Sequence, residues 1–170
     1  PVQSLPGRFS RPDLDLLIVR ENTEGLYAGR ERLEGDTAIA ERVITRRGST
    51  RIVKMAFEQA RKRSAVSGQP SVVTVVHKAN VLKVTDGLFR ECALEVAKDY
   101  PGIQCNDANV DAICMWLLKN PRNYDVMVVT NMFGDIISDL AAQLVGGLGF
   151  GCSGNIGQKL AVFEPSHGSA

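Results

Sequence analysis

Two aspartates four residues apart, Asp135 and Asp139, are the first side chains whose spacing suggests chemistry. They follow an apolar run at 126–129 that is typical of a buried strand, and Asn131 is a candidate N-cap for a helix carrying both. On a helix their Cβ atoms would lie about 5–6 Å apart, where like charges repel by a few tenths of a kcal/mol. A bound divalent cation would remove that repulsion, because hard cations such as Mg²⁺ prefer carboxylate oxygens. A solvated helix face, with Asp135 favoured by the helix dipole, explains the same spacing, so the pair alone leaves both interpretations open.

Two more polar clusters stand directly after apolar runs. The run at 14–19 ends in Arg20, with Tyr27 close behind, and the run at 72–76 is followed by Lys78. Ligand-binding groups of α/β folds gather beyond the carboxyl ends of buried strands, so these positions suit a binding site. A polar turn is the alternative for the first cluster, although a turn has no need of Arg20 or Tyr27. Lys78 has its own alternative as an ordinary surface ion-pair partner.

The elements that must position these clusters alternate in type. Apolar runs predict buried strands, and a 3.6-residue periodicity predicts helices between them. The expected strands cover 14–19, 72–76, 103–105, 126–129 and 161–163, and the expected helices cover 50–63, 81–99, 110–119 and 132–145. Strands that alternate with helices indicate an α/β fold in which helices cover a sheet.

Local signals add an arm and helix ends. Residues 37–46 alternate in a way that predicts a further strand, with 29–35 as the hairpin loop before it, and this ribbon could pair outside its own domain. Ser49 or Thr50 is the expected N-cap of the next helix. The last turn of that helix would hold the basic residues 61–63, where cations favour the helix dipole.

The helices at 110–119 and 132–145 carry more apolar surface than one sheet can cover. The economical partner for the remainder is a second copy of the chain, so a homodimer or higher oligomer is expected. The residues concerned are Val110, Ile113, Cys114, Met115, Leu117 and Leu118 on the first helix, and Ile136, Ile137, Leu140, Ala141 and Leu144 on the second.

Composition argues against several other classes of protein. The 170 residues are 44% hydrophobic and 23% charged, which is ordinary for a globular protein. A net charge of +1 gives no electrostatic case for nucleic acid, and no apolar run approaches the ~20 residues of a membrane span. The four cysteines lack CxxC spacing, which argues against a zinc site. We expect reduced thiols in an intracellular compartment, the cytoplasm or, in a eukaryote, the mitochondrial matrix.

Five motifs in a fixed order connect the clusters. They are Arg-Glu-Asn-Thr-Glu-Gly-x-Tyr from Arg20, His-Lys-Ala-Asn from His77, Val-Asp-Ala from Val110, Asn-x-Phe-Gly-Asp-Ile-x-Ser-Asp from Asn131, and Phe-Glu-Pro-x-His-Gly-Ser-Ala from Phe163. With them the chain resembles the isocitrate, homoisocitrate and 3-isopropylmalate dehydrogenases, which are metal-dependent β-decarboxylating dehydrogenases. The resemblance covers essentially all of the sequence and implies their fold.

The resemblance implies a metal site shared between subunits. Asp135 and Asp139 would bind Mg²⁺ or Mn²⁺ in one subunit, and Asp111 would reach the same ion from the other. Lys78, also from the second subunit, would accept the proton of the substrate hydroxyl. Asp111 has a simpler alternative as a helix-dipole partner in the first turn after the expected cap Asn109.

The resemblance also implies contacts with substrate and cofactor. Arg20 would bind a substrate carboxylate as a bidentate fork, and Tyr27 would return a proton after CO₂ leaves. The cofactor, NAD or possibly NADP, would bind without the G-x-G-x-x-G fingerprint, which the sequence lacks. The residues implied at the cofactor are Asn80, Glu164, His167, Gly168, Ser169 and Ala170.

Compared with the family's longer chain, the sequence resembles a small central domain followed by a return segment. Residues 1–145 would form the small domain for dimerisation, substrate and metal, and residues 146–170 would begin the C-terminal part of the large, cofactor-binding domain. The glycine-rich stretch 146–157 suits such a boundary. The chain therefore looks like a fragment, which we expect to be inactive alone because most of the cofactor cleft would be missing.

The substrate is a finer question. The motif from Arg20 resembles both the isocitrate and the homoisocitrate enzymes, and the stretch 77–87 resembles the isocitrate enzymes more. Residues 144–149 with 153–157 are also common in homoisocitrate enzymes. We expect oxidative decarboxylation of isocitrate to 2-oxoglutarate, the reaction of the tricarboxylic acid cycle. Homoisocitrate, 3-isopropylmalate, tartrate and malate analogues are alternatives. A non-catalytic regulatory subunit of a hetero-oligomeric dehydrogenase is another, although the expected metal, base and acid residues are all present. A structural module without activity of its own is a third.

Overall fold

A four-stranded parallel sheet forms the centre of the computed structural model, which describes residues 14–147, 149, 151–157 and 159–165. The strand order is β1-β6-β4-β5, and each neighbouring pair is parallel. The strands are β1 (Leu17–Arg20), β4 (Val72–His77), β5 (Gln104–Asn109) and β6 (Val126–Val129). All four residues of β6 are buried and apolar, as expected for an inner strand of a parallel sheet with both faces covered.

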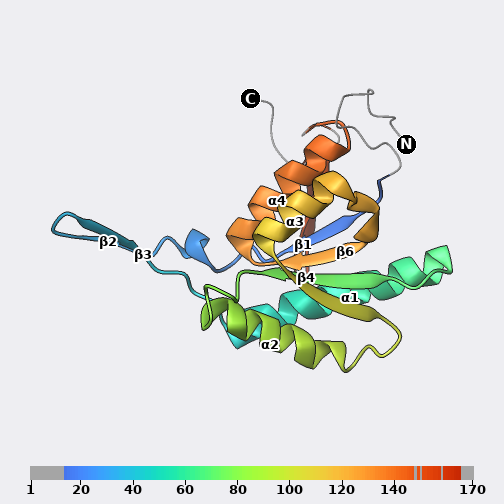
Figure 1. The fold of residues 1–170 in the computed structure, drawn as a ribbon, viewed down its shortest axis with the longest axis horizontal. Helices are drawn as coiled ribbons and strands as arrows, with labels where there is room; N and C mark the ends of the chain where they lie inside the picture. Colours follow the sequence, from blue (N-terminus) through green and yellow to red (C-terminus); the bar gives the residue numbers. More distant parts are fainter. Residues whose placement is uncertain (1–13, 148, 150, 158, 166–170) are drawn as a thin grey trace.

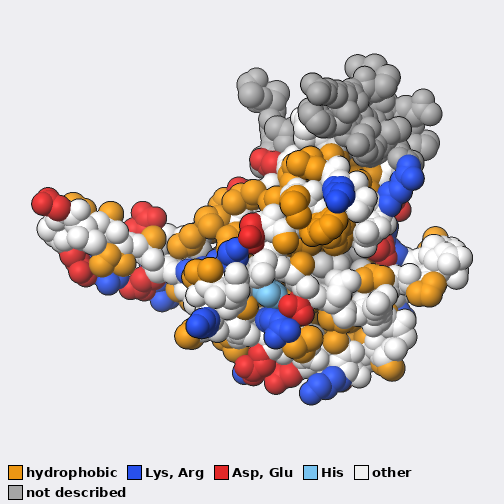
Figure 2. Space-filling model, viewed as in Figure 1, with side chains coloured by type: hydrophobic (Ala, Val, Ile, Leu, Met, Phe, Trp, Pro, Cys, Tyr) orange, Lys and Arg blue, Asp and Glu red, His pale blue; other side chains and the backbone are white. Residues whose placement is uncertain are grey.

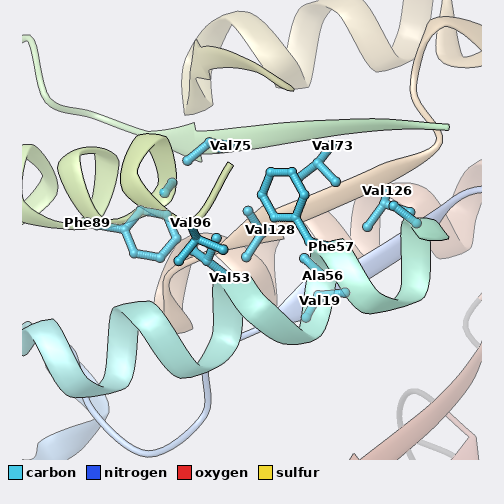
Figure 3. Packing of buried hydrophobic residues seen from close by; sticks show 12 residues of the cluster. Val19, Val53, Ala56, Phe57, Val73, Val75, Phe89, Val96, Val126 and Val128 are labelled. Atoms are coloured by element: carbon cyan, nitrogen blue, oxygen red, sulfur yellow. The ribbon is translucent and has the colours of Figure 1, made fainter. Parts of the chain in front are cut away.

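Helices cover both faces of this sheet (Figure 1). They are α1 (Arg46–Ser67) and α2 (Thr85–Ala97) on one face, and α3 (Val110–Lys119) and α4 (Asn131–Leu144) on the other. Because successive strand residues point to opposite faces, Val128 packs with α1 and α2 while its neighbours Met127 and Val129 pack with α3 and α4. Figure 3 shows Phe57 of α1 and Phe89 of α2 against the strand valines of the first face.

Two small hairpins and two short 3-10 helices complete the described chain. The hairpin of β2 (Glu31–Glu34) and β3 (Thr37–Ala40) projects from the body as an arm (Figure 1). The second pairs β7 (Cys152–Ile156) with β8 (Ala161–Pro165), and the 3-10 helices are η1 (Leu26–Ala28) and η2 (Pro121–Asn123). No helix in the described residues is long and apolar enough to cross a membrane.

The α/β fold predicted from the sequence is confirmed. The runs at 72–76 and 126–129 are strands of the central sheet, and α3 follows Asn109 as expected. All four cysteines are free, as predicted. The division into domains at 145 stays a prediction, although α4 ends at Leu144.

The arm and the helix after it differ from the prediction. The expected loop at 29–35 contains strand β2, and the strand expected at 37–46 ends at Ala40. The predicted caps Ser49 and Thr50 lie inside α1, because the Thr45 side chain accepts the Gly48 N–H at 3.0 Å and caps the helix earlier. The helix also continues to Ser67, so the basic residues 61–63 are not its last turn.

Other boundaries moved by smaller amounts. Thr130, not Asn131, is the N-cap residue of α4, and α2 begins at Thr85 rather than directly after residue 80. The strand expected at 14–19 begins at residue 17, and β7 was not predicted at all.

The apolar face expected on α4 was wrong in one position. Ile137, Ala141 and Leu144 are buried, but Ile136 is 51% exposed because it points away from the sheet. Exposed apolar side chains also lie on α3, and Figure 2 shows hydrophobic side chains gathered on this side of the molecule. We call these four residues the α3–α4 apolar surface: Met115, Trp116, Leu118 and Ile136. The expected surplus of apolar residues is thus present, and its partner stays a prediction.

Candidate functional site

The parallel sheet brings the predicted site residues to one edge. Arg20 is the last residue of β1, and Lys78 directly follows β4. Both strands pair with β6, which leads through Thr130 into α4 and its Asp135. The carboxyl ends of the three strands therefore meet where an α/β fold places its ligands.

One cluster joins Arg20, Tyr27 and Asp135. The Arg20 guanidinium forms an ion pair with Asp135 through Nη1, and the Tyr27 hydroxyl donates to the other Asp135 oxygen at 2.7 Å. Asn131 Oδ1 accepts from Arg20 Nε at 3.1 Å and from Nη2 at 2.8 Å. The guanidinium carbon also lies 5.3 Å from the centre of the Tyr27 ring. We call these residues the acid cluster, and Asn131 is a member that sequence reasoning had considered only as a helix cap.

Gly134 makes room for this arrangement. A Cβ atom at Gly134 would lie 2.6 Å from Cγ of Arg20 and 3.0 Å from its Cβ, which is far inside normal contact. The turn after β1 is fixed to the same helix, because Asn131 Nδ2 donates to the Glu24 carbonyl at 3.1 Å. The glycine of the Asn-x-Phe-Gly-Asp motif therefore lets the Arg20 side chain lie against α4.

Tyr27 is set to hold its proton. Its hydrogen bond to the Asp135 carboxylate raises the pKa of the Tyr27 hydroxyl above the ordinary value, and removal from water adds to this effect. The Tyr27 side chain nevertheless remains accessible, with 57% of the residue exposed. The cluster thus presents a protonated hydroxyl beside a guanidinium and a carboxylate.

A second cluster joins Lys78 and Asp111. The Lys78 ammonium forms an ion pair with the Asp111 carboxylate in the first turn of α3. The hydrogen bond from Lys78 lowers the pKa of Asp111, whose side chain is 65% exposed. Asn80 lies exposed in the turn just after Lys78. We call Lys78 and Asp111 the base cluster.

The backbone around Lys78 is held by two buried side chains that sequence reasoning missed. The Lys78 N–H donates to Oδ2 of Asp86 at 2.6 Å, and the Ala79 N–H donates to Nδ1 of His77 at 3.1 Å. Because Nδ1 accepts, a neutral His77 carries its proton on Nε2, which lies 2.9 Å from Oδ2 of Asp107. The only sequence signal for Asp86 was the Thr-Asp-Gly sequence at 85–87. That signal is weak, because an acidic residue in the first turn of a helix is common and is usually explained by the helix dipole.

The three predicted metal ligands do not meet within one chain. Asp135 and Asp139 lie one turn apart on α4, whereas Asp111 belongs to the base cluster. Among the described residues no three His, Cys, Asp or Glu side chains gather as a metal site. The all-carboxylate donor set suits Mg²⁺ or Mn²⁺, which prefer oxygen ligands. This separation is compatible with the prediction that Asp111 and Lys78 serve the site of a second copy.

The predicted cofactor residues are described only in part. Glu164 of β8 accepts a hydrogen bond from Asn155 at 2.9 Å, and Asn155 accepts from Asn22 at 3.1 Å. Since Asn22 stands two residues after Arg20, these bonds attach the β7–β8 hairpin beside the acid cluster. The other predicted cofactor residues at 167–170 lie outside the described residues.

Comparison with known proteins identifies the family. A sequence model of the family described as isocitrate/isopropylmalate dehydrogenase matches residues 4–170. The chain belongs to this family. It is 56% identical over 158 residues to a homoisocitrate dehydrogenase of Methanocaldococcus jannaschii, covering 93% of this chain and 44% of that protein. It is also 56% identical over 159 residues to a 3-isopropylmalate dehydrogenase of Archaeoglobus fulgidus, covering 94% and 47%.

A solved structure of the family supports the same assignment. The isocitrate dehydrogenase of Methylococcus capsulatus superposes with a TM-score of 0.88 at 49% identity, over 96% of this chain and 48% of that one. The resemblance predicted from the five motifs is confirmed, and with it membership in a family of oxidoreductases. The chain spans about half the length of the curated relatives it matches. Their names divide among three substrates, so the family membership does not decide in favour of isocitrate.

Proposed function

We propose that this chain supplies the metal, acid and base groups of a dehydrogenase that oxidises and decarboxylates a 2-hydroxy-3-carboxy acid. The observation that carries the proposal is the acid cluster, in which Tyr27 and Arg20 converge on Asp135 of α4. Isocitrate is the first substrate to test, with NAD before NADP as the cofactor and Mg²⁺ or Mn²⁺ as the metal.

Arg20 suits a substrate carboxylate. Its guanidinium already binds a carboxylate, that of Asp135, and its position is fixed by two bonds to Asn131. Arginine binds carboxylates through paired N–H donors in a planar fork, which also orients the bound group. A substrate carboxylate would engage Arg20 at the exposed side of this contact, since the Arg20 side chain is 27% exposed.

Asp135 and Asp139, with Asp111 of a second copy, would hold the metal ion. When bound, the ion would polarise the substrate's C2 oxygen during oxidation and decarboxylation. The two α4 carboxylates repel each other across one helical turn, and a cation removes that cost. Asp139 is exposed on the helix, where an incoming ligand can reach it.

Lys78 and Tyr27 would divide the proton transfers. Lys78, as the neutral amine, would accept the proton of the C2 hydroxyl, and Tyr27 would donate a proton to C3 after CO₂ departs. Bound NAD would accept the hydride from C2. Oxidation comes first, because only a C2 ketone can accept the electron pair released by the C3 carboxylate. The Asp135 hydrogen bond raises the pKa of the Tyr27 hydroxyl, which is therefore protonated at neutral pH and available as a donor.

A second copy of the chain would complete the site. Within one chain the base cluster and the α4 carboxylates are separate, and the α3–α4 apolar surface lies on the same two helices. Packing this surface against its counterpart across a two-fold axis would form a four-helix bundle. The dimer would then pair each base cluster with the acid cluster of the other copy.

Homoisocitrate and 3-isopropylmalate are the competing substrates. The relatives named above carry these names at 56% identity, while the superposed structure is an isocitrate dehydrogenase at 49% identity. One methylene in a substrate side chain changes binding by only about 1–3 kcal/mol, so few residues decide among the three. The reaction class can therefore be correct even where the substrate is homoisocitrate or 3-isopropylmalate instead of isocitrate.

The test is a substrate panel with the complete natural protein. Isocitrate, homoisocitrate, 3-isopropylmalate and tartrate are each assayed with NAD and NADP in the presence of Mg²⁺, and reduced nucleotide is measured at 340 nm. We expect turnover with one of the first three. Turnover confined to an acid other than isocitrate would replace isocitrate as the proposed substrate. No turnover with any of the four acids would favour a non-catalytic regulatory subunit.

A further inference from the structure

Asp86 is a buried carboxylate that the proposed reaction does not use. It lies in the first turn of α2 and has no exposed surface. Its Oδ2 accepts the N–H of Lys78 at 2.6 Å, and its Oδ1 lies 2.7 Å from Nη2 of Arg42. The carboxylate thus stands between the backbone of Lys78 and a cation from another part of the chain.

Arg42 connects this carboxylate to α4. The residue lies between β3 and α1, and its side chain is only 12% exposed. Nη2 of Arg42 donates to the Thr130 hydroxyl at 2.8 Å, and the guanidinium carbon lies 4.5 Å from the centre of the Phe133 ring. Thr130 is the N-cap residue of α4, and Phe133 stands two residues before Asp135.

The buried Asp86–Arg42 ion pair therefore contacts the backbone that carries Lys78 and the first turn of the helix that carries Asp135. Asp86 holds the backbone from which the Lys78 side chain extends, and Arg42 holds the first turn of the helix that carries Asp135. The Lys78 carbonyl is fixed as well, since it accepts the N–H groups of Val81 at 3.0 Å and Leu82 at 2.8 Å. With its N–H and its carbonyl both bonded, Lys78 has little freedom to change its backbone direction.

We propose that Asp86 and Arg42 form a positioning pair that fixes Lys78 relative to the start of α4. The inference rests on the proposed role of Lys78 as the base, and it adds two residues that touch neither substrate nor metal in that proposal. Misplacing a reacting group by about 1 Å can slow a reaction 10²-fold, so such a pair would act on turnover more than on substrate binding.

The chemistry of the pair favours a geometric role over a stabilising one. Removing two charges from water offsets most of their attraction, and apolar replacements of buried pairs are often as stable. An apolar pair, however, offers no acceptor to the Lys78 N–H. Stability and positioning can therefore be separated by substitution.

Three variants make that separation. Asp86→Asn keeps one oxygen that can accept the Lys78 N–H, but it removes the negative charge that pairs with Arg42. The double variant Asp86→Leu with Arg42→Met replaces the pair by apolar side chains and guards against simple unfolding. The matched control is Asp125→Asn, which removes a carboxylate that pairs with Arg63 and Ser71 at the opposite, amino end of the sheet.

The first measurement is amide hydrogen exchange at Lys78 in the complete natural protein, followed by mass spectrometry or NMR. We expect exchange at Lys78 to be about tenfold faster in the double variant, because its N–H loses a buried charged acceptor. The Asp125→Asn control should leave Lys78 unchanged. Unchanged protection of Lys78 in the double variant, folded as judged by circular dichroism, would overturn the proposal whatever the enzyme's activity.

The second measurement is steady-state kinetics on whichever substrate the panel identifies. We expect kcat to fall about 10²-fold in Asp86→Asn and in the double variant, with the substrate KM within about threefold of the original. The control should keep its kcat even where its melting temperature falls. A double variant with normal kcat would overturn the positioning role, whereas a complete protein with no turnover in the panel would refute the proposed function and leave the exchange result to decide the inference.

Discussion

Gly134→Ala should displace Arg20 and destabilise the protein, although alanine is the better helix former. The new Cβ would lie 2.6, 3.0 and 3.1 Å from Cγ, Cβ and Cδ of Arg20. Normal contact between carbon atoms needs about 3.5–4.0 Å, so the arginine must move by roughly 1 Å. Such a shift strains the bonds of Arg20 to Asn131 and its ion pair with Asp135.

The size of the effect follows from two opposing contributions. Alanine in place of glycine inside a helix stabilises by about 1 kcal/mol. Loss of the Asn131 and Asp135 contacts removes about 3 kcal/mol, taking the low end of about 1.5 kcal/mol for each partner because these side chains are partly exposed. The net loss is about 2 kcal/mol, which for a chain of this size corresponds to a fall in melting temperature of about 4–8 °C.

Gly87→Ala is the matched control. Gly87 also lies within a helix, α2, but a Cβ there would meet no atom within 4 Å. This variant should therefore gain the full benefit of about 1 kcal/mol, so the two glycine substitutions are expected to shift stability in opposite directions.

Chemical denaturation of both variants measures the difference. In the complete natural protein, Gly134→Ala should also raise the substrate KM, because the displaced guanidinium no longer meets the substrate carboxylate. If Gly134→Ala were as stable as Gly87→Ala, the close approach of Arg20 to α4 would be wrong. If it were destabilised but kept its KM, Arg20 would be a structural residue and not the carboxylate-binding group.

Three further predictions concern the metal, the oligomer and the loss of folding stability at low pH. Asp135→Asn in the complete protein should abolish turnover while circular dichroism shows a retained fold, and near-normal kcat with Mg²⁺ would refute the metal assignment. Trp116→Glu should place a charge in the α3–α4 apolar surface and convert a dimer to monomers in light scattering, whereas an unchanged mass would exclude this interface. Glu21→Gln should weaken the protein at neutral pH and flatten its loss of stability in acid, as followed by urea denaturation against pH.

The surroundings of Glu21 lower the pKa of its carboxyl group in the folded state. Burial alone would raise its pKa, but the Thr23 hydroxyl, the N–H groups of Glu24 and Thr23, and the Arg51 guanidinium outweigh it, so the folded-state pKa lies below the ordinary value. A depressed carboxyl pKa contributes stability that is present above the ordinary pKa and is lost as the pH falls through the lower, folded-state value. If the unfolding free energy of Glu21→Gln fell with decreasing pH as steeply as that of the original protein, other carboxylates would account for the acid sensitivity.

Much of the fold could be predicted because its signals are local. The buried strand at 126–129 is a continuous apolar run, and such a run reports burial without reference to the rest of the chain. The arm was predicted less well, because β2 carries exposed charged residues and lacks the alternation that marks a half-buried strand. The N-cap of α1 was misplaced for a related reason, since Thr45 is held by Glu24 from a distant turn.

The candidate site also has a part that local sequence signals predict and a part that they do not. Residue types and motif order pointed to Arg20, Tyr27, Lys78, Asp111 and Asp135, and the structure groups these five into two clusters. What sequence could not provide was which residues support them.

The residues that hold the site residues in place are distant from them in sequence. The partners of Arg20 on α4 stand 111 and 115 residues further along the chain, and neither is distinguished by type from any other asparagine or aspartate. Asp86 is the clearest case, because an acidic residue in a first helical turn is ordinarily exposed to solvent and favours the helix dipole there. Only its complete burial against Arg42 and the Lys78 N–H gives it another meaning. The site thus combines charged groups that sequence motifs reveal with buried polar contacts, such as Asp86 with the Lys78 N–H, that only the fold reveals.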